Sequence, residues 1–239
     1  MEPIKSYKKS FDYSYTLGAF PTIEMIKSHP DIVKAIYIHT SFSNQEDITQ
    51  MCTERNIPIL TNDKLITKLS DKENCFVVGI FEKFECTLDS NKSHIVLVNP
   101  SNMGNIGTII RTAVGMGIYD IAFITPCADL FNPKTIRSSM GSVFKLRHQY
   151  FSSFEEYLHQ FNKHDIFTFM LNGSETLKIQ DCPKTELFSL IFGNEATGLD
   201  DSYLKVGTSI YIPQSPDVDS LNVTIAVGIG TFIFTHQPT

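Results

Sequence analysis

The chain has 239 residues, of which 42% are hydrophobic, and its 20 basic and 26 acidic side chains give a formal net charge of −6. This balance is typical of a folded protein of one or two domains and excludes disorder as the main state. No apolar run reaches the roughly 18 residues of a membrane span, and the N-terminal residues are too polar for a signal peptide. We therefore expect a cytoplasmic protein that does not enter a membrane.

The cysteines predict neither disulfides nor a metal site. Their number, five, is odd, and the sequence contains no Cys-x-x-Cys pair. Such a set is typical of small core or loop residues in a reducing compartment. We therefore expect no bound metal.

The first 88 residues alternate between expected helices and strands. Hydrophobic periodicity predicts helices over residues 19–27, 47–55 and 63–69, and strands over residues 35–38, 57–60 and 76–81. This alternation is typical of a small α/β domain. The polar segment 88–93 has turn chemistry and is the expected linker, so we place the domain boundary between residues 88 and 89.

Residues 89–239 show a second alternation, which opens with the buried strand His94–Val98. A helix follows, and further strands are expected over residues 119–124, 166–171, 187–192 and 209–212. Helices are expected over residues 154–161 and 220–234, with Asp219 or Ser220 as the cap of the last one. The pattern predicts an α/β fold with a mostly parallel sheet, in which ligands bind in the loops at the carboxyl ends of the strands.

The first of three notable loops, residues 99–111, runs from a strand into a helix. Gly104, Gly107 and Arg111 share one face of that helix, away from its apolar stripe, so an anion can approach the guanidinium closely. The helix N-terminus adds free N–H groups and partial positive charge. The plain alternative is a tight loop with a surface arginine. Neither the dinucleotide-binding fingerprint nor a P-loop fits these glycines.

The other two loops follow later strands. In residues 191–199, two glycines let the backbone approach a ligand, and Glu195 is either a hydrogen-bond acceptor for that ligand or a helix-capping acid. In residues 212–223, two prolines stiffen an extended loop. Asn222 is polar at the start of an apolar helix, where local capping is the alternative to a binding role.

One segment is basic although the chain as a whole is acidic. Residues 130–154 contain no Asp or Glu. The cationic side chains of this segment are Lys134, Arg137, Lys145 and Arg147. A smaller cluster comprises Lys5, Lys8 and Lys9. The longer segment predicts contacts with RNA phosphates, and an ordinary solvated face is the alternative.

Together, the three loops resemble the SpoU (TrmH-like) branch of the SPOUT RNA methyltransferases. The matching strings are Asn105-Ile106-Gly107…Arg111, Gly193-Asn194-Glu195…Gly198-Leu199 and Ile212-Pro213…Ser220-Leu221-Asn222-Val223, and residues 137–142 also look like a family segment. Their order and spacing match over about residues 93–235, and three ordered motifs are a specific signal. The first block looks like the L30e-like RNA-binding domain that often precedes this catalytic domain, chiefly at residues 17–20.

This resemblance implies an enzyme that transfers a methyl group from S-adenosylmethionine (SAM) to a ribose 2′-hydroxyl of rRNA or tRNA. It also implies a trefoil-knotted sheet and a homodimer. The residues that the family pattern assigns to catalysis are Arg111, as the catalytic arginine, with Asn105, Glu195, Ser220 and Asn222 in support. The residues that it assigns to the SAM pocket are Asn172, Gly173, Gly193, Ile212 and Leu221.

The chain departs from the family in the knot loop, where Gln214 and Pro216 replace the usual methionine and glycine. Because an arginine keeps its proton in proteins, we expect Arg111 to clamp the adjacent phosphate and polarise the hydroxyl, with a role as base as the alternative. Two other functions fit the sequence less well: a non-catalytic RNA-binding or assembly factor, and a base methyltransferase of the same superfamily. A nicotinamide oxidoreductase fits least.

Overall fold

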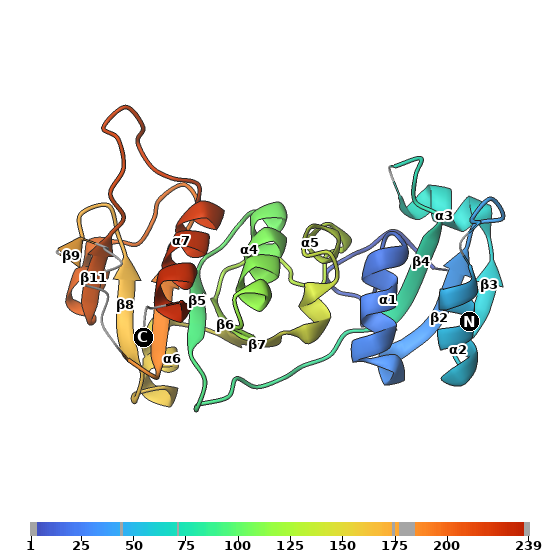
Figure 1. Ribbon diagram of the computed structural model, residues 1–239, viewed down its shortest axis with the longest axis horizontal. Coiled ribbons are helices and arrows are strands. Elements are labelled where there is room, and N and C mark those ends of the chain that lie inside the picture. Colours follow the sequence, from blue (N-terminus) through green and yellow to red (C-terminus); the bar gives the residue numbers. More distant parts are fainter. Residues whose placement is uncertain (1–3, 44, 71, 174, 177–184, 237–239) are drawn as a thin grey trace. The chain divides into compact units, whose positions relative to one another are not determined.

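The computed structural model describes residues 4–43, 45–70, 72–173, 175–176 and 185–236. The chain forms two compact units, and each is described by itself (Figure 1). The first unit combines Met1–Phe84 with Asp129–Lys145, and the second combines Glu85–Ala128 with Leu146–Thr239. The first passage from one unit to the other lies close to the expected linker, whereas the return of Asp129–Lys145 to the first unit is not predicted by the sequence pattern. None of the described helices is both long and apolar enough to span a membrane.

The first unit is built on a four-stranded mixed sheet in the order β1-β4-β2-β3. Its strands are β1 (Tyr13–Tyr15), β2 (Val33–Ile38), β3 (Ile59–Thr61) and β4 (Val77–Glu82). Its α-helices are α1 (Ala19–Ser28), α2 (Glu46–Glu54), α3 (Asp63–Leu69) and α5 (Pro133–Ser138). The three helices and three strands predicted for residues 1–88 are all present, with small shifts of their ends. Strand β1 was not predicted, because it is too short to show a period-2 pattern and forms only by pairing with β4.

The segment Asp129–Lys145 joins the first unit through aromatic packing. The rings of Phe131 and Phe144 lie 6.0 and 5.1 Å from the ring of Phe81, a fully buried residue of β4. The hydroxyl of Ser14 in β1 donates to the carbonyl of Phe131 at 2.6 Å. Burial of these aromatic rings explains why this segment folds with residues more than 40 positions earlier in the chain.

The second unit contains a seven-stranded sheet in the order β7-β6-β5-β10-β8-β11-β9, and every pair of neighbouring strands is parallel. Its strands are β5 (His94–Val98), β6 (Asp120–Ile124), β7 (Arg147–Phe151), β8 (Asp165–Phe169), β9 (Glu175–Thr176), β10 (Phe188–Phe192) and β11 (Thr208–Tyr211). The predicted α/β fold with a mostly parallel sheet is therefore confirmed. Strand β7 was not predicted, because charged and polar residues dominate this edge strand.

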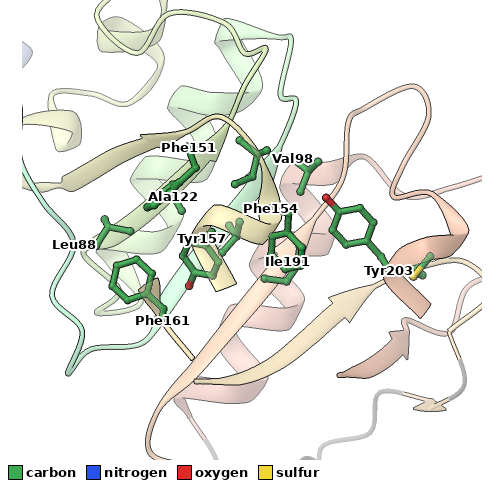
Figure 2. Packing of buried hydrophobic residues seen from close by; sticks show 12 residues of the cluster. Leu88, Val98, Ala122, Phe151, Phe154, Tyr157, Phe161, Ile191 and Tyr203 are labelled. Carbon is green, nitrogen blue, oxygen red and sulfur yellow. The ribbon is translucent and has the colours of Figure 1, made fainter. Parts of the chain in front are cut away.

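Helices cover both faces of this sheet. On one face lies α6 (Phe154–Gln160), and the buried residues that it shares with the strands include Val98, Ala122, Phe154, Tyr157 and Ile191 (Figure 2). On the other face lie α4 (Met103–Gly115) and α7 (Val223–Thr235), which also pack against each other. The contact of α7 with the sheet is close, because a Cβ on Gly230 would lie 2.6 Å from the ring of Phe169.

Helix α7 begins at Val223, later than predicted, and its cap is Asn222 rather than Asp219 or Ser220. The Asn222 side-chain oxygen accepts hydrogen bonds from the backbone N–H and the hydroxyl of Thr224, at 2.8 and 2.7 Å. An asparagine directly before the apolar run satisfies the first free N–H groups of the helix, so the preceding residues stay outside it.

A buried network of hydrogen bonds lies at the amino ends of β5 and β10. His94 Nδ1 lies 2.9 Å from the hydroxyl of Tyr157, and His94 Nε2 lies 2.9 Å from the carbonyl oxygen of Asp89. The Ser189 hydroxyl lies 2.5 Å from that of Tyr157 and 2.8 Å from His164 Nδ1. Burial lowers the pKa of His94 to about 4 and also lowers the pKa of His164, so both imidazoles are neutral at neutral pH.

This network predicts a stability that falls in mild acid. The pKa of His94 is about 4 in the folded chain and about 6.5 in the unfolded one, so the unfolded state takes up more protons between these values. Stability is therefore full above about pH 6.5 and is lost as the pH falls toward 4. From pH 8 to pH 5, we expect His94 to cost about 2 kcal/mol of unfolding free energy in urea melts followed by circular dichroism.

The matched control is His94→Gln, which keeps an amide donor and acceptor but does not titrate. Its unfolding free energy should change less between pH 8 and pH 5 than that of the unaltered protein. Equal pH dependence in the two proteins would show that the pKa of His94 is the same in the folded and the unfolded chain, which contradicts the prediction.

Candidate functional site

A cavity of about 370 Å³ lies at the carboxyl ends of β8, β10 and β11 and is lined by residues of the loops that follow these strands. Phe169 and Phe192 line it, and their rings stack with centroids 4.4 Å apart. Other lining residues include Asn172, Gly193, Asn194, Glu195, Gly198, Asp201, Ile212, Gln214, Ser220 and Leu221. The lining is mixed, with apolar rings and aliphatic side chains beside amide, hydroxyl and carboxylate groups, and such a concave site suits a small molecule that has both polar and apolar parts. Two of the loops singled out in the sequence, 191–199 and 212–223, thus contribute to one cavity.

Glycines let backbone segments touch around this cavity. A Cβ on Gly193 would lie 2.1 Å from the carbonyl carbon of Gly198, because the loop after β10 folds back on itself. A Cβ on Gly173 would lie 2.5 Å from the carbonyl carbon of Ile210 in β11. A side chain at either position would push these backbones apart. Gly193 lines the cavity, whereas Gly173 holds its loop against β11 and is not among the described lining residues.

The carboxylate of Glu195 ties the loop after β10 to the start of α4. Its Oε2 accepts from the backbone N–H and the hydroxyl of Ser101, at 3.0 and 2.9 Å. Its Oε1 accepts from the backbone N–H of Asn102 at 3.0 Å and from Nδ2 of Asn105 at 3.4 Å. Burial alone would raise the pKa of Glu195, but these hydrogen bonds outweigh burial and hold the pKa below its usual range. Glu195 is therefore ionised at neutral pH, and the structure brings it together with Asn105.

Sequence reasoning missed two asparagines that shape the same region. Asn194 Nδ2 donates to the carbonyl of Asn99 at 2.7 Å, which adds a second link between the two loops. Asn102 caps α4, because its side-chain oxygen accepts from the backbone N–H groups of Gly104 and Asn105. The signal for Asn102 was present, since an asparagine directly before an amphipathic helix is a typical cap.

Arg111 is exposed on α4 and is not among the described residues that line the cavity. The predicted apolar stripe is buried at Ile106, Ile109 and Ile110, so the core does not use the arginine. Within the described parts of the chain, the Arg111 guanidinium makes no hydrogen bond or ion pair. It lies six residues after Asn105, about 9 Å further along the helix axis. Its five donors are available to an anion from outside the chain.

The remaining residues expected to support catalysis lie in the loop before α7. Ser220 lines the cavity. Asn222 caps α7, as the alternative reading of the sequence had it, and is not among the described lining residues. Gln214, one of the two departures from the family pattern, lines the cavity, and its Nε2 donates to the carbonyl of Asp219 at 3.3 Å. This bond closes the loop on itself.

The four cations predicted to bind RNA differ in how much of their charge is compensated. In the second unit, Arg147 forms a salt bridge with the buried Asp120, with Nε 2.7 Å from Oδ1. In the first unit, Lys145 forms an ion pair with Glu24. The cations whose side chains have no hydrogen-bond or ion-pair partner among the described residues are Lys134 and Arg137, both on α5.

Comparisons with known proteins show the family of the chain. The model of the SpoU rRNA methylase family matches residues 92–232. The chain is 36% identical over 209 residues to the 23S rRNA (guanosine(2553)-2′-O)-methyltransferase RlmP of Bacillus subtilis, a match that covers 86% of this chain and 82% of that protein. It is also 36% identical over 138 residues to an uncharacterised tRNA/rRNA methyltransferase of Synechocystis, with 56% of this chain and half of that protein covered.

A solved structure has a similar fold. The AdoMet-bound rRNA methyltransferase from Sinorhizobium meliloti superimposes with a TM-score of 0.77 at 25% identity, over 93% of this chain and 86% of that one. The family match spans the whole of the parallel sheet and the three loops singled out in the sequence, two of which line the cavity. The resemblance drawn from the sequence is therefore confirmed, and the chain belongs to the SpoU rRNA methylase family.

Proposed function

We propose that this protein transfers a methyl group from SAM to a ribose 2′-hydroxyl of RNA. The observation that carries the proposal is the cavity that two of the family's loops form at the carboxyl ends of the parallel strands. The name of the Bacillus subtilis relative, a 23S rRNA 2′-O-methyltransferase, favours ribosomal RNA over transfer RNA as the substrate. Such a role agrees with the cytoplasmic location expected from the sequence.

The cavity suits SAM in size and chemistry. Its volume, about 370 Å³, lies within the range of small-molecule sites, roughly 300–1,000 Å³. The stacked rings of Phe169 and Phe192 offer apolar contact, and backbone groups at Gly193, Ile212 and Leu221 offer hydrogen bonds. SAM supplies a methyl group that its sulfonium already activates for transfer. The protein must therefore position the ribose and assist removal of the hydroxyl proton.

In this proposal, Arg111 clamps the RNA phosphate beside the target ribose and polarises the hydroxyl. An arginine offers a planar fork of donors and stays protonated, so it suits a clamp better than a base. Glu195 and Asn105 set the position of α4, which carries Arg111. Ser220 lies at the cavity, and Asn222 fixes where the loop ends and α7 begins.

A non-catalytic RNA-binding or assembly factor is the second candidate. It would have no need to keep a cavity in which Gly193 permits the backbone to fold back on itself. Binding of SAM to the purified protein separates the two candidates, because only the enzyme requires it.

We further propose that the protein works as a homodimer with a trefoil-knotted catalytic domain. Helix α7 exposes Ile225 and Phe232, seven residues apart on one face, with 53% and 47% of their surfaces accessible, and a second copy would cover them.

The knot is supported by the path of the chain after β11, which returns through the loop 212–222 to pack against α4 and β10. The first unit, with its small α/β sheet, is proposed to be an L30e-like RNA-binding domain.

The proposed clamp makes Arg111→Ala the most informative substitution. We expect folding and SAM affinity to stay nearly intact, because the side chain touches neither the core nor the cavity. Methyl transfer should fall at least a hundredfold, which corresponds to about 3 kcal/mol of barrier. Arg111→Lys should restore little, because an ammonium lacks the planar fork. Single-turnover transfer of labelled methyl to unmodified rRNA measures this, with thermal melting as the folding control. A near-normal rate in the alanine variant would refute the clamp.

The free cations on α5 make a second prediction. Removing Lys134 and Arg137 together should weaken RNA binding and flatten its dependence on salt by about 0.7–0.9 logarithmic units per lost phosphate contact. Lys145→Ala is the matched control and should change the slope less, because Glu24 already compensates this lysine. RNA affinity measured from 50 to 300 mM salt tests the difference. If the double variant keeps the full slope, the RNA lies elsewhere, for example along Lys5, Lys8 and Lys9.

A further inference from the structure

The charged side chains in the described wall of the cavity are all negative. Among the described residues that line it are two carboxylates, Glu195 and Asp201, and no lysine, arginine or histidine. The two carboxylates come from the same connection, the loop after β10 and the short 3₁₀ helix Asp201–Lys205 that follows it. The described wall of the cavity is therefore negative.

The field of the Glu195 carboxylate is already partly offset within the chain. Its oxygens accept three hydrogen bonds from Ser101 and Asn102 and one longer bond from Asn105, at the positive end of α4. These donors are neutral and leave the net charge in place, but their dipoles point at the carboxylate and partly offset its field at a ligand.

Asp201 is different. Its Oδ1 accepts a hydrogen bond from Nδ2 of Asn172 at 3.1 Å. Asn172 also lines the cavity, from the loop after β8, so this bond holds the carboxylate between two walls of the site. The amide is neutral, and no cationic side chain forms an ion pair with Asp201 among the described residues. Asp201 is exposed, so water screens its charge, but no cationic side chain of the described chain compensates it.

The proposed reaction changes the charge of that ligand. Transfer breaks the bond between the sulfonium sulfur and its methyl carbon, whose electron pair stays on the sulfur, forms the bond between that carbon and the ribose oxygen, and passes the hydroxyl proton to water. The donor, with a sulfonium, an ammonium and a carboxylate, has a net charge of about +1 at neutral pH, whereas the product S-adenosylhomocysteine is a thioether with a net charge near zero. The two molecules otherwise present the same groups.

We propose that Asp201 makes the site select the cationic methyl donor over its neutral demethylated product, with Asn172 as the residue that positions the carboxylate. This inference rests on the proposed function. Asp201 is exposed, so water screens its charge, and an interaction over several ångströms at an effective dielectric constant of about 40–80 gives a preference of roughly threefold to tenfold. The preference favours release of the product after each turnover.

Calorimetric titration of the full-length protein with SAM, with S-adenosylhomocysteine and with sinefungin tests the inference. Sinefungin carries an amine in place of the sulfonium and cannot donate a methyl group. Asp201→Asn preserves shape and hydrogen bonding, and should weaken SAM and sinefungin about threefold to tenfold while leaving S-adenosylhomocysteine within about twofold. Raising the salt concentration should shrink the difference between SAM and the product only in the unaltered protein.

Two further variants sharpen the result. Asp200→Asn is the matched control, since Asp200 caps the same 3₁₀ helix, is not among the described lining residues, and asparagine is an equally good cap. It should leave the ratio of the two affinities unchanged. Asp201→Lys reverses the charge and should make the neutral product the tighter ligand.

The outcomes are distinct. Equal weakening of SAM and S-adenosylhomocysteine by Asp201→Asn would overturn the inference, because the carboxylate would then act on a group that both ligands share. An unchanged ratio in both Asp201 variants would overturn it as well. If the unaltered protein binds none of the three ligands, the proposed function itself fails, and the inference fails with it.

Discussion

The carboxylate of Glu195 holds together the two loops on which the cavity depends. It lies in the loop after β10, and its partners, Ser101 and Asn102, lie directly before α4. Ser101 and Asn102 are exposed, so water competes for these hydrogen bonds, and we expect each to contribute about 1 kcal/mol rather than the larger amount typical of buried ionised groups. Loss of the carboxylate would leave two backbone N–H groups unpaired and release the start of the helix that carries Arg111. The pKa of Glu195 is lowered by the same bonds, because they stabilise the ionised carboxylate and would be lost on protonation.

The carboxyl ends and the amino ends of the parallel strands have different roles. At the carboxyl edge, glycines and polar side chains shape a cavity from loops, where the backbone is free to approach a ligand. At the amino edge, His94 and Asp120 hold the segment around Asp89 against the sheet, since Asp120 Oδ1 accepts from the backbone N–H of Asp89 at 2.9 Å. The buried histidines lie at the edge away from the cavity. Acid therefore weakens the fold through a region that does not contact the proposed ligand.

The sequence carried enough information for the fold and for the loops of the site. Period-2 and period-3.6 patterns located most elements, because these strands and helices bury one face or both. The glycine at position 193 marked the place where the backbone folds back. Other features depend on contacts between distant residues, and no local pattern contains them. Phe131 and Phe144 bury their rings against Phe81, which moves a segment of the chain into the first unit. The salt bridge of Arg147 with Asp120 likewise compensates a cation that the sequence pattern predicted to be available to RNA phosphates.

The cavity beside Gly193 is the proposed site of ribose methylation in rRNA. The most direct test of this role is nucleoside mass spectrometry of rRNA from cells that lack the gene and from cells that regain it as the unaltered, Gly193→Ala or Gly115→Ala form. A Cβ at position 115 meets nothing within 4 Å, whereas one at position 193 collides with the backbone of Gly198. We expect one 2′-O-methylnucleoside to disappear on deletion and to return with the unaltered and Gly115→Ala forms, but not with Gly193→Ala. An unchanged set of 2′-O-methylnucleosides in the deleted cells, or full restoration by Gly193→Ala, would contradict the account.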